Sequence, residues 1–188
     1  MPRIYLVSIR KSGQMAIAKD LRFKNICFYG EYRPRAFLKV LLSDGTSAVV
    51  FYRLNQFFQR IYLGAIGCLF LELNKLLNGC VIGRKAEFGA GFVIMHPYGV
   101  VINSEVKGGE NIVIESGVVI GAAKNGLPVK APILGNNIFI GSGAKVLGGI
   151  RVGNNVKIGA NAVVVKDVPD NVTVVGIPAK EIASLRSQ

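Results

Sequence analysis

Apolar residues recur every six positions from about residue 81 to residue 164. Glycine often follows directly, and a second small or aliphatic residue stands four positions after the start of each repeat. This period matches neither the 3.6-residue repeat of an amphipathic helix nor the alternation of one long strand. Short strands joined by tight corners fit it, because Gly and Asn adopt turn conformations that other residues resist. The repeats start at Ile82, Phe88, Ile94, Ile102, Ile114, Ile120, Leu134, Ile140, Val146, Val152, Ile158 and Val164.

The six-residue repeat predicts a solenoid. Three short strands make one triangular coil, the first residue of each repeat points inward, and stacked coils bury a continuous aliphatic core. The predicted fold class is therefore mainly β, a parallel β-helix of hexapeptide repeats over residues 80–168. After Pro169 the chain leaves the repeat, and residues 169–188 are expected to close the last coil and form a short tail.

Two segments interrupt the period. From Ile94 to Ile102 there are eight residues in place of six, and from Ile120 to Leu134 there are fourteen where two repeats need twelve. Each segment is therefore expected to add two residues. Insertions in a solenoid protrude as loops on one face, where function tends to collect. The first loop, 95–101, contains the only histidine of the chain, His96, and the second is 121–132.

The first 79 residues are expected to form a mostly helical region. The apolar pattern over 36–78 is typical of helices, and Gly79 offers a natural stop. This region is expected to cover the open end of the solenoid. An alternative is that the segment 53–75, which is apolar with interspersed basic residues, also lies on an anionic membrane surface. Residues 1–35 are charged and show no period, so no structure is predicted for them.

The charge balance limits the class of partner. The chain has 188 residues with 23 Lys and Arg against 11 Asp and Glu, a net charge of +12. Such a charge favours anionic partners, which include nucleic acid, acidic lipid headgroups and phosphorylated small molecules. No nucleic-acid recognition motif accompanies it, so we expect no nucleic acid as partner. No apolar run approaches the roughly 20 residues that span a bilayer, so no transmembrane helix is predicted.

Cysteine and histidine are too few for a structural metal site. Three cysteines without paired spacing and one histidine offer no zinc ligand set, so no metal is expected and a reducing, cytoplasmic location is favoured. The glycines at 141–146 lack the third glycine of a dinucleotide-binding fingerprint. Residues 121–127 lack the Lys-Ser/Thr pair of a phosphate-binding P-loop.

Several short motifs point together to one family. They are Leu-Asn-Gly at 77–79, the loop His-Pro-Tyr-Gly-Val-Val-Ile at 96–102, the second loop, the segment 140–148, Lys-Asp-Val-Pro at 166–169 and Val-Gly-Ile-Pro-Ala-Lys at 175–180. With them the chain resembles the hexapeptide-repeat acyltransferases, in particular the serine acetyltransferase branch and related sugar O-acetyltransferases. The resemblance implies a left-handed β-helix, acetyl transfer from acetyl-CoA to a hydroxyl, and a homotrimer with active sites between neighbouring subunits.

The resemblance also assigns roles to single residues. His96 matches the general base, and an unperturbed imidazole, with a pKa of about 6.5, is largely neutral and available at pH 7. Donors for the thioester oxyanion and a slot for pantetheine complete what the reaction needs. The positions implied to bind the acetyl-CoA cosubstrate are Gly121, Ala122, Ser142, Lys157 and Ala160.

The chain departs from the serine acetyltransferase pattern at its polar positions. Met95 stands where that branch has an aspartate before the catalytic histidine, and Val-Ile-Gly-Arg at 81–84 replaces Asp-Ile-His-Pro. In the second loop, Val-Lys-Ala-Pro at 129–132 replaces Asp-Arg-His-Pro, so the second active-site histidine is missing. The carboxylate that orients the base is lost as well. A backbone carbonyl, Glu105 or Glu115 is expected to take its place.

The lost groups bear on the acceptor. Polar groups that recognise a substrate discriminate strongly, so a site that discards them is expected to have changed its acceptor. The preferred prediction is a small acceptor such as a sugar or glycan precursor, bound by Tyr98, Lys130 and Glu105. This acceptor would suit polysaccharide biosynthesis and a peripheral position at the inner membrane face. The alternatives are serine O-acetylation for cysteine biosynthesis and a catalytically silent solenoid scaffold.

Overall fold

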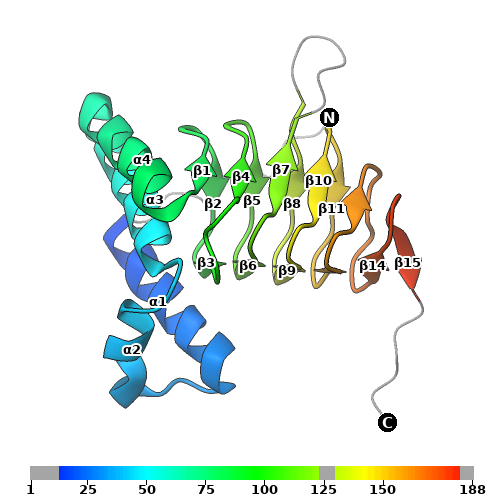
Figure 1. The fold of residues 1–188 in the computed structure, drawn as a ribbon, viewed down its shortest axis with the longest axis horizontal. Helices are drawn as coiled ribbons and strands as arrows, with labels where there is room; N and C mark the ends of the chain where they lie inside the picture. The colour runs from blue at the N-terminus through cyan, green and yellow to red at the C-terminus, as the bar shows by residue number, and fades with distance from the viewer. Residues whose placement is uncertain (1–12, 123–129, 183–188) are drawn as a thin grey trace, which may run out of the picture.

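The computed structural model describes residues 13–122 and 130–182. Helices form one end of the molecule, and a solenoid of short strands extends from them (Figure 1). The helical region precedes the solenoid directly in the chain. The helical elements are α1 (Gly13–Tyr29), η1 (Pro34–Ala36), α2 (Phe37–Leu41), α3 (Thr46–Arg60) and α4 (Gly64–Asn78).

The strands form three sheets, which we name A, B and C. Sheet A contains β1 (Val81–Ile82), β4 (Val101–Ile102), β7 (Val119–Gly121), β10 (Lys145–Leu147) and β13 (Val163–Val164). Sheet B contains β2 (Glu87–Phe88), β5 (Lys107–Gly108), β8 (Ile133–Leu134) and β11 (Arg151–Val152). Sheet C contains β3 (Phe92–Ile94), β6 (Ile112–Ile114), β9 (Ile138–Ile140), β12 (Lys157–Ile158), β14 (Thr173–Val175) and β15 (Lys180–Ile182).

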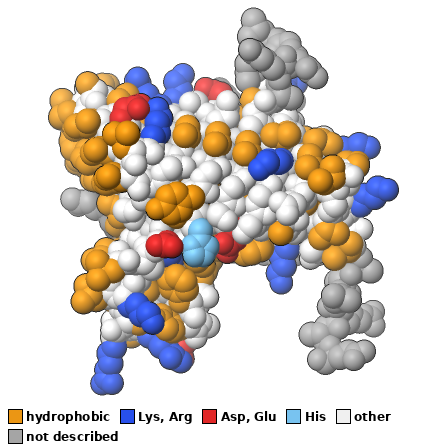
Figure 2. Space-filling model, viewed as in Figure 1, with side chains coloured by type: hydrophobic (Ala, Val, Ile, Leu, Met, Phe, Trp, Pro, Cys, Tyr) orange, Lys and Arg blue, Asp and Glu red, His pale blue; other side chains and the backbone are white. Residues whose placement is uncertain are grey.

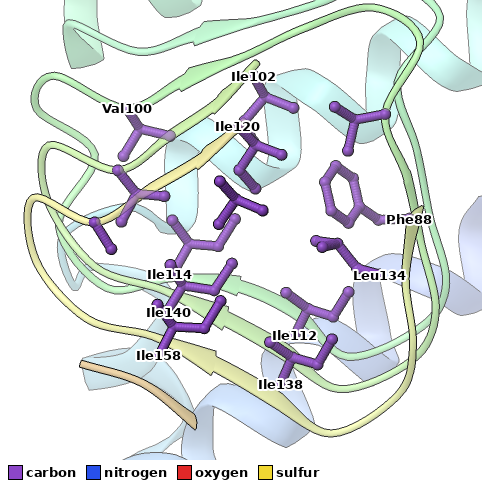
Figure 3. Close-up of a cluster of buried hydrophobic side chains, with 14 of the residues drawn as sticks. Phe88, Val100, Ile102, Ile112, Ile114, Ile120, Leu134, Ile138, Ile140 and Ile158 are labelled. Atoms are coloured by element: carbon purple, nitrogen blue, oxygen red, sulfur yellow. The ribbon is translucent and has the colours of Figure 1, made fainter. Parts of the chain in front are cut away.

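The chain visits the sheets in the order A, B, C, so each round is one coil. All pairs are parallel except β14–β15, which closes the last coil. The register stacks the repeat positions on each other: Ile102 pairs with Ile120, and Ile114 with Ile140. Their side chains fill the interior as aliphatic columns (Figure 3). The prediction of a left-handed hexapeptide β-helix after an N-terminal helical region is confirmed.

One inward position carries no side chain. Gly108 lies in sheet B between Phe88 and Leu134, and a Cβ there would come within 2.7 Å of the Phe88 ring and of Ile112. The Phe88 ring stacks on Phe92 with a centroid distance of 4.1 Å. Phe88 therefore fills space that the next coil leaves open, which is why the aliphatic period skips position 108.

The two insertions are unequal, contrary to the prediction. Ile94 lies in sheet C and Ile102 in sheet A, one corner apart, so the first loop adds two residues as expected. Ile120 lies in sheet A and Leu134 in sheet B, which is also a single corner. Fourteen residues there replace six, so the second loop adds eight residues and not two. The sequence does not state which sheet a repeat joins, and residues 123–129 of this loop lie outside the described residues.

The helical region differs from the prediction in detail. The segment 36–78 is divided into separate helices, with turns at Gly45 and Tyr62, both of which have positive φ. Helix α1 lies where no structure was predicted. Its buried face is mainly polar, with Asp20, Lys24 and Asn25, so hydrophobic periodicity does not reveal it.

Helix α3 covers the first coil of the solenoid. Tyr52 is fully buried, its ring packs on Phe88 and Phe92, and its hydroxyl donates to the carbonyl of Ala86. The apolar core of the coils therefore continues into the helices. Across the described ranges, no helix has the length and apolar composition needed to cross a membrane.

Candidate active site

His96 belongs to the inserted part of the corner between β3 and β4. The amide of Met95 bonds to Ile114 O one coil below, and the amide of Gly117 bonds to Tyr98 O. Met95 and Tyr98 therefore occupy ordinary corner positions, and His96 and Pro97 between them are the two extra residues. The imidazole projects from the solenoid with 59% of its side-chain surface exposed.

The imidazole has an acidic partner from the helical region. His96 Nδ1 lies 3.3 Å from Oδ2 of Asp44, which is in the turn between α2 and α3. Figure 2 shows the histidine on an open face of the molecule beside an acidic side chain. An ionised carboxylate only accepts hydrogen bonds, so the hydrogen of this bond is on Nδ1, and in a neutral ring Nε2 then keeps its lone pair. This is the tautomer that a general base acting through Nε2 requires.

Sequence reasoning missed Asp44. Glu105 and Glu115 were expected to stand in for the lost orienting carboxylate, but of the acidic side chains in the described ranges it is Asp44 that hydrogen-bonds to the ring. It lies 52 residues before the histidine, in a segment that was assigned to a helical cap. The one signal in the sequence is Asp44-Gly45, a dipeptide that marks turns.

The turn that carries Asp44 is pressed onto the end of β3. Gly45 has a φ of 72°, and a Cβ on it would lie 2.8 Å from the backbone carbon of Ile94. Only glycine combines this conformation with such a close approach. The contact brings the α2–α3 turn beside the strand that leads directly into the histidine loop.

Lys24 of α1 contacts both the α2–α3 turn and the end of β3. Its ammonium is buried and donates to the carbonyl of Asp44, to Oγ1 of Thr46 at 3.0 Å and to the carbonyl of Ile94 at 3.2 Å. Burial lowers the pKa of Lys24 from 10.5 to about 8, while the charge of Asp44 acts in the opposite direction. The cation is therefore held against its desolvation cost by three oxygen acceptors.

This pKa predicts a pH-dependent stability. The folded pKa lies below the unfolded one, so between about pH 8 and pH 10.5 the unfolded chain binds more protons and stability rises with pH. Relative to Lys24→Met, the wild type is expected to gain up to about 3 kcal/mol over this range, because each pKa unit is worth about 1.4 kcal/mol. Urea unfolding of both proteins at several pH values measures it. A wild-type minus variant difference that stays flat across this range would contradict the assignment.

Three further predicted residues share the edge that carries His96. Backbone hydrogen bonds link Gly117 to Tyr98, Gly143 to Ser116, and Asn161 to Ser142, so Tyr98, Ser116, Ser142 and Ala160 are equivalent positions on successive coils. Together they form a straight track along the corner between sheets C and A. Lys157 lies on the outer face of β12 in sheet C, the strand that leads into this corner just before Ala160.

The other predicted residues lie at a different edge. Glu105 and Lys130 are exposed at the corner between sheets A and B, where Gly121 and Ala122 begin the long second loop. The stem of Lys130 lies against Gly149, where a Cβ would be 3.0 Å from Lys130 Cδ. Sheet A separates this edge from the histidine edge, so one copy of the chain does not bring the two groups together. In the described part of the chain, no cluster of His, Cys, Asp and Glu is suited to a metal ion.

Comparisons with known proteins identify the family. Residues 131–166 match the model of the bacterial transferase hexapeptide (six repeats). Over 167 residues the chain is 40% identical to serine acetyltransferase from Synechococcus elongatus, covering 88% of this chain and 67% of the relative. Over 147 residues it is 39% identical to serine acetyltransferase from Helicobacter pylori, covering 78% of this chain and 86% of the relative.

Solved structures agree in fold. A serine acetyltransferase from Neisseria gonorrhoeae in complex with serine superposes with a TM-score of 0.79 and 32% identity, covering 91% of this chain and 69% of that one. A serine acetyltransferase from Brucella abortus in complex with coenzyme A superposes with a TM-score of 0.81 and 28% identity, covering 90% and 67%. The chain therefore belongs to the serine acetyltransferase family and is an acetyl-CoA-dependent O-acetyltransferase.

Proposed function

We propose that the protein transfers the acetyl group of acetyl-CoA to the hydroxyl of serine, with His96 as general base. The observation that carries the proposal is the His96–Asp44 pair on the inserted loop, in a chain whose named relatives are serine acetyltransferases. The comparisons favour serine, the alternative of the sequence analysis, over the sugar acceptor that it preferred. None of the relatives named above is a sugar acetyltransferase, and polysaccharide biosynthesis has no support from them.

The proposed chemistry needs one base and a place for the thioester. Nε2 of His96 takes the hydroxyl proton while the serine oxygen bonds to the acetyl carbonyl carbon. The tetrahedral intermediate then collapses, the carbon–sulfur bond breaks, and the thiolate of CoA takes the proton from the imidazolium. The products are the O-acetyl ester and the free thiol. Asp44 stabilises the imidazolium that forms between the two proton transfers, as a carboxylate beside a catalytic histidine does.

The proposed acetyl-CoA site follows the edge that carries His96. The small residues Ser142 and Ala160 leave this track open for the pantetheine arm, and Lys157 offers a cation for a CoA phosphate. Gly121 and Ala122 contribute from the other edge. A homotrimer would set that edge of one copy against the histidine edge of its neighbour, which a single copy does not achieve. The likeness to a relative solved with coenzyme A supports an acetyl-CoA site in this chain.

The proposed acceptor site uses groups from both edges. Tyr98 has 67% of its surface exposed two residues after the base. Lys130 and Glu105 lie at the corner between sheets A and B. Their charges are opposite to those of the carboxylate and the ammonium of an amino acid. Met95 and the lost second histidine then mean that serine is held by a smaller set of charged groups than in the family pattern. Cytoplasmic location and a peripheral membrane contact stay predictions.

The acceptor is tested by acetyl-CoA turnover. We expect thiol release with L-serine as acceptor at least about 100-fold faster than with neutral or acidic sugars, because a site built for a charged amino acid leaves its polar groups unpaired with other acceptors. D-serine and O-methylserine are matched controls, since the first reverses the chirality and the second lacks the hydroxyl. Turnover on a sugar with none on serine would overturn the proposal and restore the sugar acceptor.

A further inference from the structure

We propose that Lys24 is a positioning residue for the reaction: it fixes the two backbone segments that carry Asp44 and His96, and so holds the pair in register. This inference rests on the proposed role of His96 as base, but not on the identity of the acceptor. Lys24 lies 20 residues before Asp44 and touches no reacting group. Its effect is therefore exerted through Asp44.

The hydrogen bonds of Lys24 reach both backbone segments that carry the His96–Asp44 pair. One acceptor is the backbone carbonyl of Asp44, whose own side chain bonds to the imidazole. A second is the carbonyl of Ile94, two residues before the histidine, and the third is Oγ1 of Thr46, beyond Gly45. A single ammonium thus ties the α2–α3 turn to the end of β3.

The His96–Asp44 pair needs this support because its two side chains are exposed. The side chains of Asp44 and His96 are 69% and 59% exposed, so packing does not fix their rotamers. Their hydrogen bond, at 3.3 Å, is longer than a strong charge-assisted bond. Catalytic groups lose rate with small displacements, so the position of the backbone under each side chain decides whether the bond forms.

Stability alone does not explain a lysine at this position. Burying a cation costs free energy, so the three hydrogen bonds of Lys24 must first offset its desolvation before they stabilise the fold. Helix α1 is already attached to the first coil, because Asp20 accepts from the amides of Gly91 and Phe92 and pairs with Arg53. What a methionine at position 24 would lose is the link between the two segments under the catalytic pair.

The experiment compares Lys24→Met, Asp44→Ala, Asp44→Asn and the double variant Lys24→Met/Asp44→Ala. Steady-state turnover with L-serine gives kcat and KM. Long-range proton–nitrogen NMR of ¹⁵N-labelled protein reports the hydrogen on each ring nitrogen, and its assignment is immediate because the chain has one histidine. Lys19→Met is the matched control, since Lys19 is on the exposed side of the same helix.

We expect Lys24→Met and Asp44→Ala each to lower kcat about 10- to 100-fold, as removal of supporting partners usually does, with KM changed less than about threefold. In both variants, the ring-nitrogen signals of His96 should move away from the values typical of a neutral ring with its hydrogen on Nδ1. Asp44→Asn retains an oxygen acceptor and should restore part of this signature. The double variant should lose no more than Asp44→Ala, because both changes break the same link. The control should match the wild type.

Other outcomes overturn the inference. A folded Lys24→Met protein with wild-type kcat and wild-type ring signals would exclude a positioning role. So would a double variant whose losses multiply, because Lys24 would then act independently of Asp44. If Lys24→Met does not fold, Lys24→Gln keeps a donor there and takes its place. A wild type inactive on serine would refute the proposed acceptor, while the NMR comparison would still decide the role of Lys24.

Discussion

Replacing His96 by alanine is expected to lower kcat by about 10²- to 10⁴-fold, the range that a general base contributes. The ring has one described hydrogen-bond partner, Asp44, and 59% of its side-chain surface is exposed on the inserted loop, so little packing is lost with it. The free energy of unfolding should therefore change by less than about 0.5 kcal/mol, as for other exposed sites. Loss of rate without loss of stability would identify the residue as part of the chemistry.

The measurement is thiol release from acetyl-CoA under saturating L-serine, with urea unfolding of the same preparations. Lys19→Met serves again as the surface control. Because imidazole would act by proton transfer, kcat should fall while KM for acetyl-CoA stays within about threefold. Equal kcat for wild type and His96→Ala would exclude His96 as the base. A variant with much lower stability would instead assign the residue to the fold.

The solenoid could be predicted because its physics is local. Each repeat position such as Ile114 or Ile140 is buried by the coil above and below, so the six-residue period is written directly in the sequence. The length of the second loop could not be predicted in the same way. Counting residues from Ile120 to Leu134 does not reveal how many corners the chain turns, and only pairing with neighbouring coils decides that.

Only part of the candidate site could be predicted from the sequence. His96 stood out because its loop breaks a regular period and the histidine is unique. Asp44 and Lys24 did not, because each reaches the site through tertiary contacts across 52 and 70 residues, to His96 and Ile94. A helix whose buried face is polar gives no hydrophobic period, so α1 and its buried charges were missed together.

A second large effect is expected at the buried ion pair that joins α1, α3 and the first coil. Arg53 donates from Nε to Asp20 at 2.8 Å, and both side chains are 3% exposed. The guanidinium also donates to the carbonyls of Phe88 and Gly89. Arg53→Met should lower the free energy of unfolding by about 3–5 kcal/mol, because it leaves a buried carboxylate without its charge partner and two carbonyl acceptors without their donor.

Urea unfolding tests this value, with Lys75→Met as control. Lys75 pairs with Glu72 on the surface at 43% and 61% exposure, so its removal should cost less than about 1 kcal/mol. A cost for Arg53→Met as small as that of the control would show that the buried pair contributes no more than a surface one. The double variant Asp20→Asn/Arg53→Met should recover part of the loss, since no uncompensated charge remains and Asn keeps an oxygen acceptor for the amides of Gly91 and Phe92.

The pH dependence of the loss separates the lost charge partner from the lost packing. Burial raises the pKa of Asp20, and Arg53 works against that rise. Without Arg53 the folded pKa rises further above the unfolded value, so stability is present at low pH and is lost as pH rises through the folded pKa. The destabilisation of Arg53→Met should thus be smaller at pH 5 than at pH 7.5, because a protonated Asp20 is neutral and can donate to a neighbouring carbonyl. A loss independent of pH would assign the effect to packing of the arginine stem rather than to the charge.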